Sequence, residues 1–326
     1  MAAFYSGIVG DAFFSIPAKT RWTVCFLVTL FTARFTLLHL RFGQTNILVL
    51  ALVVLGLTLL AKRQGVSGGF AIGFSIVIKL ITAPFGFWFA ARRSYRVMLG
   101  MILAGVIGFG LPALIVGFEK NVNYHREWVE RVVLTNAPGT GVWTGNGNVS
   151  LRAQVDRFFL DTPAFEYAGK YYSVTIVELT PKTVSLIGYL IVLLVTLATG
   201  VYAVSFRNEV ELVSNWGGYA LVFSLIPSFT PVTEIPHLVI LIPAYLYVVH
   251  LWYTERLADR TFLVLLVSSF VLTTLTSKTF CGKYLGRVFA STGVINLGIL
   301  MLTAAIFRAA FCIKKKTEDP ATAPAD

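Results

Sequence analysis

The chain has little charge, and acidic charge is the scarcest. Its 326 residues include 16 Asp and Glu against 27 Lys and Arg, and charged residues make up only 13% of the total. Hydrophobic residues make up 56%, and the mean hydropathy is +0.75. A soluble domain carries roughly 25% charged residues, so this composition excludes one and indicates a polytopic membrane protein. We therefore expect the net charge of +11 to face anionic lipid headgroups, with no nucleic-acid partner.

Other absences narrow the function. The cysteines (Cys25, Cys281 and Cys312) are few, odd in number and far apart, which excludes a disulfide framework and metal-ligand spacing. The first 20 residues lack a basic start followed by an apolar core, so no cleavable signal peptide is predicted. The Gly-rich phosphate loop, the zinc-binding HExxH helix and the GxSxG elbow are absent as well. We expect no cofactor and no metal site.

Long apolar runs are the main positive signal. Runs of roughly 17–25 residues can cross a bilayer as helices, and their continuity favours helices over alternating strands. We predict an all-α membrane protein with about nine spans. The predicted spans lie near residues 22–40, 45–61, 66–91, 96–118, 183–206, 216–230, 236–253, 261–277 and 288–311. The predicted organisation is an N-terminal segment 1–21, helices over 22–118, an external region 119–182, helices over 183–311 and a disordered basic tail 312–326.

Basic residues in short loops predict the orientation. Three groups share one side of a nine-span chain, which we assign to the cytoplasm: Arg92, Arg93 and Arg96; Arg256 and Arg260; Lys314, Lys315 and Lys316. Two groups fall on the opposite side as exceptions: Lys62 with Arg63, and Lys278 with Lys283 and Arg287.

The external region contains two amphipathic stretches, near 122–133 and 151–159, which we predict to lie at the membrane surface. A loop rich in Gly and Asn joins them and ends in Asn148-Val149-Ser150. Its amides and hydroxyls could hydrogen-bond a sugar, or the loop could be a plain turn.

Lys79 stands inside the apolar run 66–91. A lysine at that depth costs roughly 2.5–3.5 kcal/mol on insertion scales and usually faces a polar cavity or partner. We interpret Lys79 as the counter-ion of a lipid phosphate, the alternative being a side chain that snorkels to the interface. Arg34, within the first span, is a second buried cation that could snorkel in the same way.

Glu234 and His237 lie three residues apart in a region interrupted by Pro227, Pro231 and Pro236. Broken apolar segments tend to line binding sites. A histidine can exchange protons at working pH, and a carboxylate can orient it or bind hydroxyl groups. Glu234 could equally be an ordinary capping acid.

The corner Arg41-Phe-Gly-Gln-Thr-Asn46 between the first two spans is polar, and alone it suggests only a helix start capped by Thr45 or Asn46.

The order of these motifs resembles glycosyltransferase family 87. The resemblance covers roughly residues 40–250 and consists of GQTN, an intramembrane Ile-Lys, the basic loop ARRSYR, GNGNVS and EIPH before an apolar helix. It implies a GT-C-type fold and transfer of a hexose, mannose first, from a polyprenyl-phosphate sugar to a glycolipid or glycan acceptor. It implies a place in the bacterial plasma membrane, on whose external face the reaction occurs.

By that resemblance, the donor and substrate residues are Gln44, Asn46, Lys79, Asn148, Ser150 and His237. Family members begin with about a hundred further residues that include an acidic catalytic loop (a length that one span and one loop would need). In this chain Asp11 is the only acid before residue 119, and its surroundings do not match. The catalytic residue is therefore unassigned, with His237 and Glu234 as candidates. A lipid or solute transporter and a non-catalytic GT-C-like subunit are the alternatives.

Overall fold

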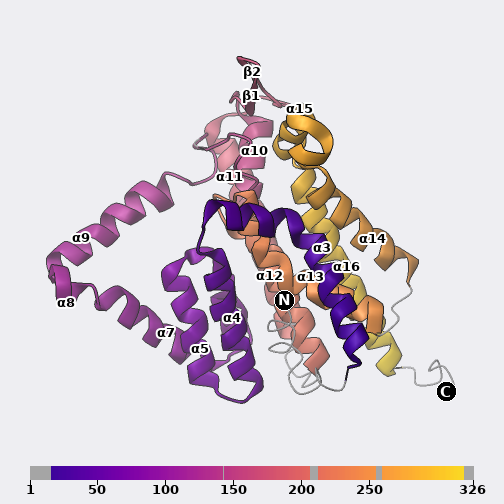
Figure 1. The fold of residues 1–326 in the computed structure, drawn as a ribbon. Helices are drawn as coiled ribbons and strands as arrows, with labels where there is room; N and C mark the ends of the chain where they lie inside the picture. The colour runs from indigo at the N-terminus through magenta and orange to yellow at the C-terminus, as the bar shows by residue number, and fades with distance from the viewer. Residues whose placement is uncertain (1–15, 142, 206–211, 255–258, 319–326) are drawn as a thin grey trace.

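The structure is a computed structural model that describes residues 16–141, 143–205, 212–254 and 259–318 (Figure 1). Asp11, Arg256 and the last eight residues of the tail lie outside the described residues. Within them, α16 continues to Glu318, so the basic residues after the last predicted span are helical, while most of the predicted disordered stretch lies outside the described residues.

Helices make up most of the described chain. The first half contains α3 (Ala18–Phe42), α4 (Asn46–Ala61), α5 (Gly65–Ile78), η1 (Leu80–Thr82), α6 (Pro84–Ala91), α7 (Tyr95–Gly110), α8 (Ala113–Val116), α9 (Phe118–Trp128) and the π-helical η2 (Val129–Leu134). The connecting region that follows adds α10 (Leu151–Phe159) and a hairpin of β1 (Phe165–Tyr167) and β2 (Lys170–Tyr172). The second half contains α11 (Pro181–Ser205), α12 (Leu212–Phe229), η3 (Ile235–Leu241), α13 (Ile242–Thr254), α14 (Arg260–Phe270), η4 (Val271–Leu275), α15 (Lys278–Ser291) and α16 (Val294–Glu318).

Several of these helices are long and apolar enough to cross a membrane. In the described residues four qualify: Ala18–Phe42, Tyr95–Val116, Pro181–Ser205 and Ile235–Thr254. A fifth candidate is the pair Arg260–Leu275 and Lys278–Ser291, which is bent by 87°. Five shorter apolar helices accompany them. The predicted helical membrane protein is confirmed, whereas the number of nine spans is not.

Residues 66–91 form two helices instead of the single predicted span. α5 and α7 touch at three glycines: Gly69 lies against Val97, Gly73 against Met101, and Val77 against Gly108. Residue numbers therefore rise in the same direction along both helices. The two helices are therefore parallel neighbours, and the chain between them has to run back. Residues 79–91 make this return, which turns 65–91 into a helical hairpin.

Small residues allow this close pairing. A Cβ on Gly69 would lie 2.0 Å from the Val97 carbonyl oxygen, and one on Gly100 would lie 2.1 Å from that of Val66. Neither position can accept a larger side chain without moving a backbone. Gly69 and Gly73, four residues apart on α5, thus allow the close packing that positions the hairpin with Lys79 at its apex.

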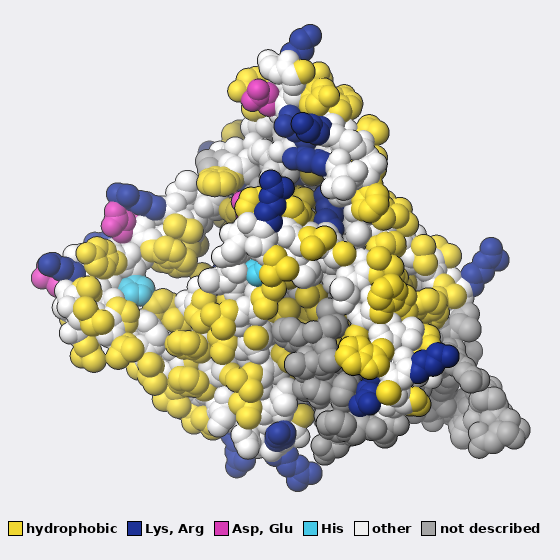
Figure 2. Space-filling view, viewed as in Figure 1, with side chains coloured by type: hydrophobic (Ala, Val, Ile, Leu, Met, Phe, Trp, Pro, Cys, Tyr) yellow, Lys and Arg dark blue, Asp and Glu magenta, His cyan; other side chains and the backbone are white. Residues whose placement is uncertain are grey.

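The hairpin also changes the distribution of basic residues. Gly65, which follows Lys62 and Arg63, packs against Arg96. Lys62 and Arg63 therefore share one end of the bundle with Arg92, Arg93 and Arg96, and they are no longer exceptions to the charge rule. Figure 2 shows basic side chains at this end, below α4 and α5. The group on α15 stays at the opposite end, near the β-hairpin (Figure 1).

The two amphipathic stretches differ in their exposure. The stretch on α9 and η2 is exposed, with Trp128 and Val132 more than 40% exposed, as the prediction of a surface helix requires. The stretch on α10 is buried, so its placement at the membrane surface is wrong. Its charged residues pair inside the protein, where Arg152 lies 3.2 Å from Asp156.

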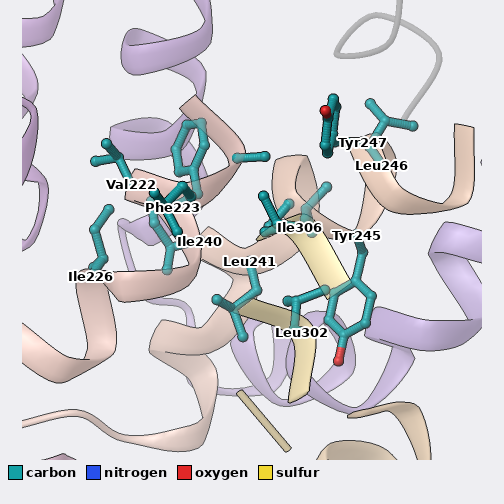
Figure 3. Close-up of a cluster of buried hydrophobic side chains, with 14 of the residues drawn as sticks. Val222, Phe223, Ile226, Ile240, Leu241, Tyr245, Leu246, Tyr247, Leu302 and Ile306 are labelled. Carbon is teal, nitrogen blue, oxygen red and sulfur yellow. The ribbon is translucent and has the colours of Figure 1, made fainter. Parts of the chain in front are cut away.

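The core lies where the second half of the chain converges. Side chains of α12, η3, α13 and α16 interdigitate there, among them Phe223, Leu241, Tyr245 and Ile306 (Figure 3). The predicted interruption is found around Pro231, because α12 ends at Phe229 and the chain turns through residues 230–234 before η3 begins. Pro227 does not break the chain, since it lies inside α12, and Pro236 lies in the first turn of η3. The segment from η3 through α13 is 83% buried, so its start is firmly positioned.

Candidate active site

Lys79 lies at the apex of the helical hairpin. α5 ends at Ile78, and the backbone of Lys79 is extended, with φ −156° and ψ 118°. Pro84 is the first residue of α6. The buried hydroxyls of Ser75 and Thr82 lie 2.8 Å apart and tie the two sides of the break together. A proline at a helix start fits here because its missing N–H needs no partner. The break thus directs a long cationic side chain into the bundle.

Two polar partners meet the Lys79 amine. Its Nζ donates to Asn46 Oδ1 at 2.6 Å and lies 3.0 Å from His237 Nε2. Asn46 Nδ2 donates to Gln44 Oε1 at 2.6 Å, and Gln44 Nε2 donates to Glu234 Oε2 at 3.1 Å. The polar corner, the intramembrane lysine and the Glu-Ile-Pro-His motif therefore form one network, which we name the Lys79 network.

The hydrogen bonds determine which atom of His237 carries a proton. Its Nδ1 accepts the backbone N–H of Glu234 at 3.0 Å, in a capping box at the start of η3. The proton of a neutral ring then belongs to Nε2, the atom that faces Lys79. An ammonium group offers only donors, so the Lys79 ammonium and the Nε2–H of His237 face each other at 3.0 Å as two donors without an acceptor between them. An oxygen anion would accept from both.

Asn148 and Ser150 lie beside this network and brace it. Asn148 Oδ1 accepts the backbone N–H of Ser150 and that of Thr233, both at 3.0 Å. Ser150 Oγ donates to the carbonyl of Pro231 at 2.9 Å and, as N-cap of α10, accepts the N–H of Ala153 at 3.1 Å. Both side chains are buried and their polar atoms are engaged. The geometry gives them the task of holding residues 231–234, and direct contact with a sugar stays a prediction.

Two buried basic residues near the network were missed by sequence reasoning. His39, in the last turn of α3, is 4% exposed and interacts electrostatically with Lys79 and His237. Its position seven residues before Asn46, on the helix that leads into the polar corner, was the available signal.

Arg157 on α10 is the second. It is fully buried and donates to the carbonyls of Thr144 and Asn148 and to that of Ser291. Burial lowers the pKa of its guanidinium to about 10, an effect that the neighbouring Asp156 opposes. It pins the Gly/Asn-rich loop to the end of α15. No sequence signal distinguishes it from the surface charge that the amphipathic pattern predicted.

Metal-ligating side chains do not cluster in the described part of the chain: no group of three or more His, Cys, Asp and Glu there could hold an ion. The chemistry available at the Lys79 network is that of two N–H donors, a carboxylate and two amides.

Comparison with known proteins gives one assignment. The sequence profile described as glycosyltransferase family 87 matches residues 8–224. No curated protein and no solved structure matches. The matched region covers about two thirds of the chain and ends within α12, so it includes α3, the corner, Lys79 and the loop with Asn148. The chain therefore belongs to glycosyltransferase family 87, a family of membrane glycosyltransferases.

Proposed function

We propose that this protein transfers a hexose, with mannose as the first candidate, from a polyprenyl-phosphate sugar to a glycolipid or glycan acceptor. The membrane would be a bacterial plasma membrane and the reaction would take place at its external face, in a fold of the GT-C type. The observation that carries the proposal is the pair of adjacent nitrogen donors, Lys79 Nζ and His237 Nε2, which lie 3.0 Å apart at a helix break inside an apolar bundle.

The donor phosphate is the natural acceptor for those two groups. An intramembrane cation without a carboxylate within ion-pair distance is stabilised by an anionic ligand, and a phosphate oxygen accepts from both Lys79 and His237. In a site shielded from water such contacts strengthen as charge develops on the leaving phosphate. Gln44 and Asn46 orient the lysine and offer further hydrogen bonds.

An apolar groove beside the hairpin suits the lipid chain of such a donor. It has a volume of about 550 Å³ and lies between α6, the second half of α11 and the end of α12. Pro84, Trp88, Leu197, Val201 and Phe229 are among its lining residues. Because α6 begins five residues after Lys79, a lipid whose phosphate reaches Lys79 could lay isoprenoid units along this groove.

The transfer itself needs a base and a stabilised leaving group. The acceptor hydroxyl gives its proton to a carboxylate, and its oxygen attacks the anomeric carbon. The bond from that carbon to the phosphate oxygen breaks, and the polyprenyl phosphate leaves with the electron pair. Of the two candidates, Glu234 suits the base better, because both ring nitrogens of His237 already face N–H or amine groups. His237 then binds the phosphate.

The test is transfer by purified protein reconstituted with a radiolabelled polyprenyl-phosphate mannose donor and a membrane glycolipid extract as acceptor. We expect Lys79→Ala and His237→Ala each to abolish transfer while the protein still inserts into membranes. Lys62→Ala, in the basic loop at the opposite end of α5, is the matched control and should remain active. Wild-type rates in both site variants would overturn the assignment. Movement of the lipid across the membrane without sugar transfer would indicate a transporter, and no activity in any form would indicate a non-catalytic subunit.

A further inference from the structure

Arg34 is a second intramembrane cation, and the Lys79 network does not use it. It lies on α3, a candidate span, eight residues before the helix ends at Phe42, or about 12 Å along the axis. Its side chain does not snorkel to the interface. Nη1 instead donates to the backbone carbonyl of Thr273 at 2.6 Å and to Thr276 Oγ1 at 3.3 Å, at the end of η4.

These two bonds leave part of the guanidinium unsatisfied. The carbonyl of Thr273 belongs to the last turn of a helix, where carbonyl groups lack intrahelical partners and carry partial negative charge. This attraction explains why the Arg34 side chain points toward η4. Neither bond supplies a negative charge. Arg34 Nε is buried and has no hydrogen-bond partner. A buried donor without a partner and a buried charge without a counter-ion are both costly.

Two further cations converge on the same place. Lys278 is the first residue of α15, at the 87° bend and two residues after Thr276, whose hydroxyl accepts from Arg34. Arg287 lies one helical segment further on and next to Gly286, which packs against the backbone of Lys278. Its guanidinium is held by the β-hairpin, where Nη1 donates to the carbonyl of Glu166 and the group lies 5.7 Å from the Tyr167 ring centre.

No carboxylate balances this cluster among the described residues. The four ion pairs found there involve Arg126, Arg131, Arg152 and Arg308, and none involves Arg34, Lys278 or Arg287. Figure 2 shows several basic side chains in a column from the hairpin toward the middle of the molecule. Arg34 and Arg287 are held in place by carbonyl groups, and their repulsion with the neighbouring Lys278 at the edge of an apolar bundle favours a bound anion.

We propose that Arg34, Lys278 and Arg287 form a second anion site, which binds the phosphate group of a membrane lipid headgroup. A lipid is the fitting source because Arg34 is on a candidate membrane span, while Lys278 and Arg287 are on α15, the second half of the bent candidate span. The guanidinium of Arg34 would bind the phosphate from the depth of the membrane, and the two α15 side chains would bind it from the surface. The site goes beyond the proposed transfer and does not require it.

The test is native mass spectrometry of the full-length, detergent-purified protein titrated with phosphatidylglycerol. Diacylglycerol with the same acyl chains, which lacks the phosphate, is the lipid control. We expect retention of one phosphatidylglycerol above the diacylglycerol level, and at least tenfold weaker retention in Arg34→Gln and in Lys278→Gln. Gln at position 34 can still donate to Thr273, which limits damage to the fold, and Arg34→Lys should restore part of the binding.

Lys283→Gln, an exposed lysine on the same helix, is the matched control and should retain the lipid as the wild type does. Equal retention by the wild type, Arg34→Gln and Lys278→Gln would overturn the site. Displacement of the lipid by an equal concentration of inorganic phosphate would overturn its assignment to a headgroup. Transfer activity is not the readout, so failure of the proposed function leaves this result interpretable.

Discussion

Lys79 and Arg34 are both cations on apolar segments, yet the fold treats them differently. Lys79 occupies a helix break, and its amine meets the side chains of Asn46 and His237. Arg34 stays within a continuous helix and is held by a backbone carbonyl at the end of another helix. At the helix break, side chains from several motifs contact the Lys79 amine. In the unbroken helix, the Arg34 side chain mainly holds the neighbouring segment η4 in place. Chemistry is therefore expected at Lys79, and lipid anchoring at Arg34.

The largest expected effect separates the two cations directly. Replacing Lys79 or His237 by Ala should reduce sugar transfer by about 10³-fold, because each removes a donor aimed at the developing phosphate charge. Phosphatidylglycerol retention should be unchanged in both variants. If the Lys79 and His237 variants lost both sugar transfer and phosphatidylglycerol retention, the two cations would belong to one site. Arg34→Gln, measured in the same two assays, provides the comparison.

Glu234→Gln tests whether Glu234 is the base of the Lys79 network. The amide keeps the size of the side chain but cannot accept a proton, so we expect a loss of about 10²-fold in transfer rate. Donor affinity should change little, which the KM against kcat split measures. A raised KM with normal kcat would place Glu234 in donor binding and leave the base unassigned.

Asn148→Ala tests the brace behind Glu234. Removing the amide that holds Thr233 and Pro231 should loosen residues 231–234, and we expect about tenfold slower transfer with a normal fold. Asn146→Ala, a change of the same kind two residues away in the same loop, should have no effect. An unchanged transfer rate in Asn148→Ala would mean that the start of η3 keeps its position without the bonds from Asn148.

Gly100→Ala tests the hairpin that carries Lys79. The new methyl group would meet the Val66 carbonyl oxygen at 2.1 Å, so we expect about 1–3 kcal/mol lower stability, measured by thermal unfolding in detergent. Gly105→Ala on the same helix meets nothing within 4 Å and should be neutral or slightly stabilising. Equal melting temperatures for the two variants would contradict the parallel packing of α5 and α7.

The smallest effect is expected on the exposed helix α9. The Arg131–Glu127 pair is 2.7 Å long but solvent-exposed, and such pairs contribute about 0–1 kcal/mol. Arg131→Ala should leave transfer, lipid retention and the melting temperature unchanged within error. A marked loss of transfer would reveal a role for α9 that neither cation site explains.

The sequence indicates which residues meet better than it indicates how the chain runs. Lys79 and His237 stand out because a charge in an apolar run and a proline-broken segment are local signals, whereas Asn46 is marked by the family resemblance. The structure brings the three side chains into contact, and their part in transfer stays a prediction. The return of residues 79–91 was missed because hydropathy measures length without direction, and only the contact between Gly69 and Val97 reveals it. α10 was misplaced for a related reason, since an amphipathic pattern does not say whether protein or solvent covers the charged face. Arg157 is covered by the carbonyl of Ser291, 134 residues away in the sequence, and by that of Thr144 in the preceding loop.

The most direct test of the central claim is retention of a sugar-free polyprenyl phosphate by the purified protein, followed by native mass spectrometry. The account predicts one bound lipid phosphate in the wild type and in Glu234→Gln, and at least tenfold weaker retention in Lys79→Ala and in His237→Ala. Retention in those two variants equal to the wild type would contradict it, because the donor phosphate would then bind somewhere other than between Lys79 and His237.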